Sequence, residues 1–87
     1  MTDAPFLPVP VPAFGRLPAG DVPTLAGWLA EVGEPVVRGQ RVAEVTVPGV
    51  LVEAVSPADG VVVRQNVAAG QPADPGEPLG WVERHGG

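Results

Sequence analysis

The chain has 87 residues, the size of one small domain, of which 45% are hydrophobic and only 5% aromatic. Its five arginines and ten carboxylates give a formal net charge of −5, which repels phosphate backbones and anionic lipid surfaces, so we expect neither nucleic acid nor a membrane as partner. The absence of cysteine excludes disulfide bonds and thiolate metal sites, and the chain contains no lysine.

Twelve glycines and twelve prolines punctuate the sequence. So high a share is common in disordered chains, but here these residues separate valine-rich runs at regular intervals, which is typical of a compact all-β fold with many turns. The N-terminal segment lacks the basic region of a secretory signal, and no apolar run approaches the roughly 20 residues that span a bilayer. We therefore expect a cytoplasmic protein.

We expect one domain over residues 6–83, between flexible ends at residues 1–5 and 84–87. Within the domain, residues 6–14 alternate proline with apolar side chains. Because proline cannot donate a hydrogen bond to a neighbouring strand, this segment is predicted to be extended and to lie at a sheet edge. A loop rich in glycine and proline follows over residues 15–23.

Residues 24–32 are predicted to form a strand that contains Trp28. The short apolar run LAGWLAEV could suggest a helix, but Gly27 in its middle and the absence of an N-cap argue against one. A turn-rich connection over residues 33–41 then leads to the centre of the chain.

A hairpin occupies the centre of the chain, with strands predicted over residues 42–47 and 50–55. Its tip is Pro48-Gly49, because proline fixes φ at the second position of a type II turn and glycine supplies the positive φ of the third. The flanking residues are mostly β-branched, which favours strands. After the hairpin we expect, in order, a turn over residues 56–59, a strand over 60–67, a loop over 68–77 and a last strand over 78–82.

An internal repeat relates the two halves of the chain. Residues 33–45 align without gaps on residues 70–82, at an offset of 37. The matching positions are Gly33 with Gly70, Pro35 with Pro72, Gly39 with Gly76, Val42 with Leu79, and Val45 with Val82. The repeat predicts two similar halves joined at the hairpin.

Three segments carry a resemblance to a known family: VPAFG at residues 11–15, WLAEVGEPVVRGQRVAEV at 28–45 and SPADGVV at 56–62. In this order they resemble the lipoyl and biotinyl carrier domains, specifically the lipoyl domain of 2-oxo acid dehydrogenase acyltransferases, over nearly the whole chain. The resemblance implies an all-β flattened barrel or sandwich of two four-stranded antiparallel sheets, related by a pseudo-twofold axis.

The family carries lipoate or biotin on a lysine at the tip of the central hairpin. When the chain is aligned with the family through Glu44 and Glu53, that lysine falls on Gly49. A glycine has no amine to acylate, and no other lysine is present. The resemblance therefore implies that neither lipoate nor biotin is attached at the tip, and we expect no cofactor.

Candidate partner-recognition residues lie on and beside the tip: Glu44, Val47, Pro48, Gly49, Val50 and Glu53. The simpler interpretation is that Pro48 and Gly49 only suit the turn and that the glutamates are solvated surface charges. Trp28 and Trp81 are interpreted as packing residues. His85 has no second histidine beside it, and no metal site or catalytic residue is predicted.

We therefore expect a binding or assembly module without lipoate, which is not an enzyme by itself and docks to a 2-oxo acid dehydrogenase-type or related multienzyme complex. Its predicted partners are proteins, namely dehydrogenase or carboxylase complex subunits. Two alternatives stay open at this point. One is a degenerate, carrier-like accessory subunit of a larger enzyme, and the other is a structural, lipoyl-like spacer domain.

Overall fold

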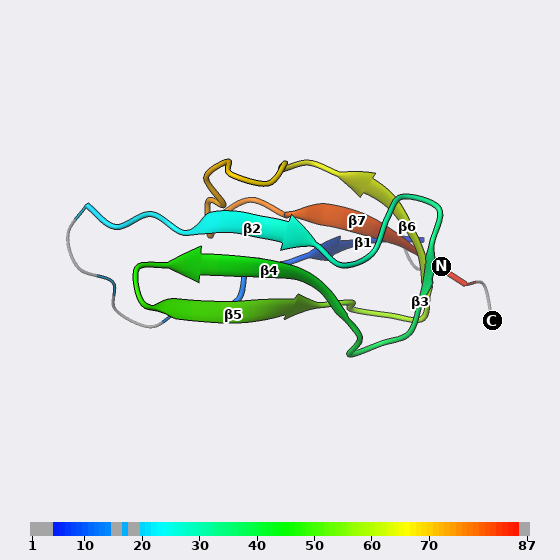
Figure 1. The fold of residues 1–87 in the computed structure, drawn as a ribbon. Helices are drawn as coiled ribbons and strands as arrows, with labels where there is room; N and C mark the ends of the chain where they lie inside the picture. The colour runs from blue at the N-terminus through cyan, green and yellow to red at the C-terminus, as the bar shows by residue number, and fades with distance from the viewer. Residues whose placement is uncertain (1–4, 15–16, 18–19, 86–87) are drawn as a thin grey trace.

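A computed structural model of the chain describes residues 5–14, 17 and 20–85. Its regular elements within these residues are all β-strands (Figure 1), which confirms the predicted all-β class. The strands are β1 (Phe6–Val9), β2 (Thr24–Trp28), β3 (Pro35–Val36), β4 (Arg41–Val47), β5 (Val50–Val55), β6 (Gly60–Gln65) and β7 (Gly80–Arg84).

The strands form two antiparallel sheets. One has four strands in the order β1-β7-β6-β3, and the other has three in the order β2-β4-β5. The sheets are not closed into a continuous barrel. β1 lies at an edge, as the prolines of its segment predicted.

The prediction of two four-stranded sheets is wrong for the second sheet, which has three strands within the described residues. The place of its fourth strand is taken by Pro72, which lies 37 residues after Pro35 of β3 and forms only a single bridge with Thr24. The bridge rests on two hydrogen bonds, from the Leu25 N–H to the Gln71 carbonyl and from the Ala73 N–H to the Pro23 carbonyl. Pro23 has no N–H to return a bond to Ala73, and Pro75 follows closely, so the pairing does not extend into a regular ladder.

The internal repeat is confirmed by a matching pair of backbone hydrogen bonds. The N–H of Gly33 donates to the carbonyl of Val62 over 2.7 Å, and the N–H of Gly70 donates to the carbonyl of Leu25 over 2.8 Å. Donor and acceptor both shift by 37 positions, but in opposite directions, so each half supplies the donor of one bond and the acceptor of the other. This exchange is the signature of a pseudo-twofold axis between the halves.

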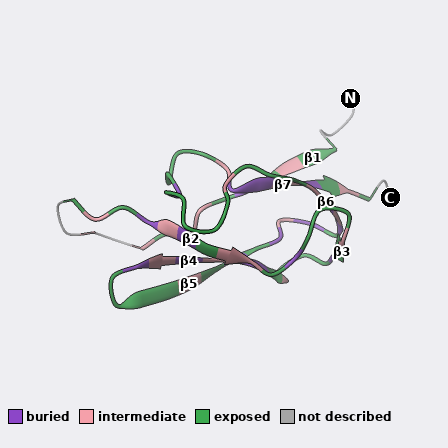
Figure 2. Cartoon of the chain, turned by 45° about the horizontal axis from the view of Figure 1, so that its top comes forward, coloured by how far each residue is buried: buried purple, intermediate pink, exposed green. Residues whose placement is uncertain are grey.

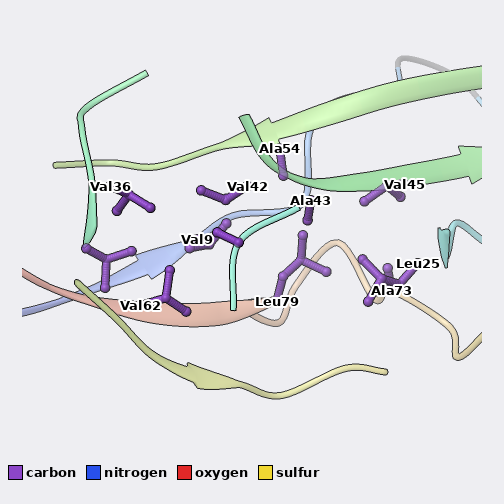
Figure 3. Close-up of a cluster of buried hydrophobic side chains, with 12 residues drawn as sticks. Val9, Leu25, Val36, Val42, Ala43, Val45, Ala54, Val62, Ala73 and Leu79 are labelled. Atoms are coloured by element: carbon purple, nitrogen blue, oxygen red, sulfur yellow. The ribbon is translucent and has the colours of Figure 1, made fainter. Parts of the chain in front are cut away.

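The core lies between the two sheets and consists of small aliphatic side chains (Figure 3). The repeat positions Val42, Val45, Leu79 and Val82 are all fully buried in it. Trp28 is partly buried against this cluster. The buried cluster comprises Val9, Leu25, Ala30, Val36, Val42, Ala43, Val45, Ala54, Val62, Ala73, Leu79 and Val82.

Several strands differ in extent from their predictions. β2 ends at Trp28 rather than at residue 32, because the chain turns there and the backbone N–H of Glu34 bonds back to the carbonyl of Glu31. β3 lies inside the segment predicted as a connection. β6 ends two residues earlier than predicted, and β7 begins and ends two residues later.

The ends of the chain were predicted to be flexible, and residues 1–4 and 86–87 lie outside the described residues. The backbone N–H of Arg84 donates to the carbonyl of Pro5 over 2.7 Å, so β7 continues one residue past the predicted domain boundary. The flexibility of the ends stays a prediction. Of the predicted loop over residues 15–23, residues 15–16 and 18–19 also lie outside the described part.

Candidate functional site: the central hairpin tip

The hairpin of β4 and β5 projects to the end of the molecule away from the chain termini (Figure 1). Val47 pairs with Val50, which leaves Pro48 and Gly49 as a two-residue loop. Gly49 has φ of 82°, in the left-handed region that favours glycine. The predicted tip and its glycine conformation are therefore confirmed.

The tip surface, defined as Pro48, Gly49 and Val50, is exposed and apolar. Val50 is 48% exposed, and both residues of the loop are exposed as well. Figure 2 shows the exposed stretch continuing along β5. Val47, which the sequence placed in the same recognition set, is only 6% exposed and supports the tip from the core side.

The hydroxyl of Thr46 links the two strands at the base of the tip. Thr46 Oγ1 donates to the carbonyl of Val50 over 2.8 Å and lies 3.1 Å from the carbonyl oxygen of Val47. These contacts span the strands beside the turn, so they hold the tip in one shape. No local pattern in the sequence marks a hydroxyl that will reach across a hairpin.

The two glutamates of the recognition set lie directly opposite each other on β4 and β5. Like charges in this arrangement repel. Arg41 Nη1 lies 3.0 Å from Glu53 Oε2 and forms an ion pair with it, which offsets the repulsion. The charges therefore lie on the strands behind the tip, and residues 47–51 carry none.

Gly49 occupies the position that the resemblance gives to the family's lysine. A Cβ atom at this residue would meet no atom within 4 Å, so there is space for a side chain. The positive φ, however, strains any residue with a Cβ. The tip offers no nucleophile or titratable group, and its chemistry is limited to apolar and backbone contacts.

The remaining candidate residues occupy structural positions. Trp28 donates through Nε1 to the carbonyl of Val67 over 2.8 Å. Ser56 is buried, and its hydroxyl donates to the carbonyl of Ala58 over 2.7 Å, which fixes the predicted turn. His85 is exposed. No group of three or more His, Asp or Glu residues that could hold a metal ion occurs among the described residues.

The two antiparallel sheets, the pseudo-twofold repeat and the central hairpin with its exposed two-residue tip define the biotinyl and lipoyl class of carrier domain. The family model described as "Biotin-requiring enzyme" matches residues 8–82, and the chain belongs to this family. Domains of the family normally carry biotin or lipoate and are non-catalytic modules of multienzyme complexes. No curated protein matches the chain. The described part of the chain contains no helix that could span a membrane.

Proposed function

We propose that this chain is a carrier-type domain that holds neither biotin nor lipoate at its hairpin tip and serves as a docking module in a 2-oxo acid dehydrogenase-type or carboxylase-type complex. The observation that carries the proposal is Gly49 at the end of the hairpin, in a loop without amine or charge. The family model matches the chain on both sides of this residue, over residues 8–82.

The chemistry of attachment supports the first half of the proposal. Biotin and lipoate are joined to a carrier through an amide, which requires a side-chain amine. Gly49 has no side chain, and the basic side chains of the sequence other than His85 are arginines, which stay protonated and are poor nucleophiles. The nearest hydroxyl, on Thr46, is already engaged with the carbonyl of Val50.

The shape and composition of the tip support the second half. Exposed apolar groups such as Pro48 and Val50 gain free energy when a partner removes them from water. The two-residue loop and the Thr46 hydroxyl already hold the tip in one conformation, so little conformational entropy is lost when it binds. A tip of this kind fits an apolar recess in a partner subunit.

The first experiment is an intact-mass spectrum of the protein purified from its native cells, together with identification of the proteins that co-purify. We expect the unmodified mass and a dehydrogenase or carboxylase subunit alongside. Isothermal titration with that subunit should then give a binding signal that weakens roughly 3- to 10-fold for Val50→Thr, because a buried methyl is replaced by a hydroxyl.

The matched control is Val37→Thr, since Val37 is 59% exposed and lies outside the hairpin. It should leave the binding signal unchanged. A mass gain on the native protein would overturn the claim that the tip is unloaded. An absence of heat with decarboxylase, carboxylase and ligase subunits would overturn the docking role.

A further inference from the structure

The four outer edges of the two sheets are protected to different degrees. β1 contains Pro8, which cannot donate a hydrogen bond, and β3 is only two residues long and contains Pro35. The outer side of β2 is met by the bridge between Thr24 and Pro72. Among the edge strands of the described residues, β5 alone is six residues long and free of proline.

The backbone of β5 faces outward at alternate residues. Val47 and Val50 flank a two-residue loop and therefore form a hydrogen-bonded pair. Along β5, the N–H and C=O groups of Leu51, Glu53 and Val55 then point away from β4, toward the open edge. Among the described residues, no backbone hydrogen bond reaches these three residues across that edge.

The side chains along this edge are also available. Leu51 is 57% exposed and Val55 is 43% exposed, and Figure 2 shows β5 as an exposed strand at the margin of its sheet. An edge that combines free backbone groups with exposed aliphatic side chains is a template for another strand. The structure thus offers one such template in each chain.

We propose that β5 pairs in antiparallel fashion with β5 of a second copy of this chain, about a twofold axis that passes through Glu53. The pairing joins two three-stranded sheets into one continuous sheet. A second copy is the occupant that one open edge favours. Isologous pairing uses the same edge on both chains and closes the assembly, whereas head-to-tail growth would require a second open edge on each.

The strand is self-complementary in this register. Leu51 lies opposite Val55 of the second copy, so the exposed aliphatic side chains meet at both ends of the contact. All three outward residues of each chain find partners, whereas a shift by two residues in either direction leaves at least one of them unpaired or facing Gly49 or Pro57.

The centre of the contact brings the two Glu53 side chains together. Each carries its own counter-charge, because Arg41 lies 3.0 Å away on β4. Glu44, which faces Glu53 from β4, adds a further negative charge. The carboxylates therefore weaken the dimer without preventing it. The contact is also small beside a standard interface of about 1,600 Å², so we expect a dimer that dissociates on dilution.

Because the chain has no cysteine, single cysteine variants test both the partner and the register. Glu53→Cys should form a disulfide-linked dimer under mild oxidation, since residues paired on the axis have Cα atoms about 5.5 Å apart. Leu51→Cys should not, because the two copies of that residue lie roughly 14 Å apart along the strands. Val22→Cys, exposed but outside the hairpin, serves as the background control.

Sedimentation of the cysteine-free protein between micromolar and millimolar concentration completes the test. We expect a concentration-dependent dimer that Leu51→Lys abolishes and that Glu53→Gln strengthens roughly two- to five-fold, since opposed like charges are removed. Circular dichroism checks that both variants keep their fold. A monomer throughout, cross-linking of Leu51→Cys equal to that of Glu53→Cys, or occupation of β5 by a different protein would each overturn the proposal.

Discussion

The indole N–H of Trp28 donates a 2.8 Å hydrogen bond to the carbonyl oxygen of Val67, 39 residues further along the chain. Trp28 ends β2 in the three-stranded sheet, and Val67 follows β6 in the four-stranded sheet. The ring also lies over Gly80, where a Cβ would come within 2.8 Å of the Trp28 ring. One side chain therefore fastens the two sheets together at the margin of the core.

Replacement of this tryptophan should weaken the domain measurably. Trp28→Phe removes the donor, leaves the Val67 carbonyl without its partner and opens space over Gly80, so we expect a loss of about 1–3 kcal/mol in the free energy of unfolding. Urea denaturation followed by circular dichroism measures it. Trp81→Phe is the control, because Trp81 is half-buried beside Phe6 and Arg64 and its indole makes no hydrogen bond in the described part of the chain. Equal losses in both variants would contradict the special role of Trp28.

Gly60 should tolerate no side chain. A Cβ at this position would overlap the backbone carbonyl of Glu83 on β7, and backbone cannot move aside without breaking the β6–β7 ladder. We expect Gly60→Ala to cost about 3 kcal/mol or more, or to prevent folding.

Gly27→Ala is the matched control for Gly60→Ala. A Cβ at Gly27 meets no atom within 4 Å, so its free energy of unfolding should stay within about 0.5 kcal/mol of the parent. Thermal melts of the two variants, run side by side, measure the difference. A Gly60→Ala protein as stable as Gly27→Ala would show that β6 and β7 separate more easily than their packing indicates.

The features of the fold that depend on residues adjacent in the sequence could be predicted from the sequence. The Pro48-Gly49 turn follows from the φ preferences of two adjacent residues, and the repeat placed Val42 and Leu79 in equivalent core positions. β3 was missed because two residues carry no periodicity. Its strand character comes from pairing with Val61 and Gly60, more than twenty positions away.

The candidate site was predicted with similar limits. The residues of the tip can be predicted because they depend only on their neighbours in the sequence. The alternation of a strand is equally local, and it places Val47 on the same face as the buried Val45, so it could have removed Val47 from the recognition set. The bond from Thr46 and the ion pair between Arg41 and Glu53 depend on register across the hairpin. Neither contact leaves a pattern that can be recognised in the sequence alone.

The left-handed backbone of Gly49 should make the tip sensitive to any Cβ. Gly49→Ala introduces no clash, so its cost is the conformational strain at φ of 82°, about 1–2 kcal/mol. Gly49→Asn should cost less, since asparagine tolerates this region better. Denaturant titration of the three proteins gives the order Gly, Asn, Ala. An alanine variant as stable as the parent would mean that the tip relaxes to another turn type.

The double variant Pro48→Asp with Gly49→Lys tests whether the rest of the hairpin still presents an attachment site. If Glu44 and Glu53 hold the strands as a ligase requires, incubation with lipoate ligase, lipoate and ATP should add one lipoyl group, detected as a mass gain. Val37→Lys places a lysine on an exposed surface away from the tip and should remain unmodified. An unchanged mass in the double variant would show that the recognition surface has diverged along with the lysine.

The pseudo-twofold repeat makes the two halves of the chain interchangeable in their backbone bonding. The bond from Leu29 N–H to the Val42 carbonyl and the bond from Asn66 N–H to the Leu79 carbonyl both measure 2.8 Å, and they too differ by 37 positions. A circular permutant opened between Pro48 and Gly49 should therefore retain the strand pairings.

The described ends already lie together, since the Arg84 N–H bonds to the Pro5 carbonyl. A short linker between them would close the permutant and create a new loop at the end of the molecule where the termini now lie (Figure 1). That engineered loop would be the twofold counterpart of Pro48-Gly49. The fold could thus be made to present a peptide of choice at the end of the molecule opposite the hairpin tip, while its core sequence stays unchanged.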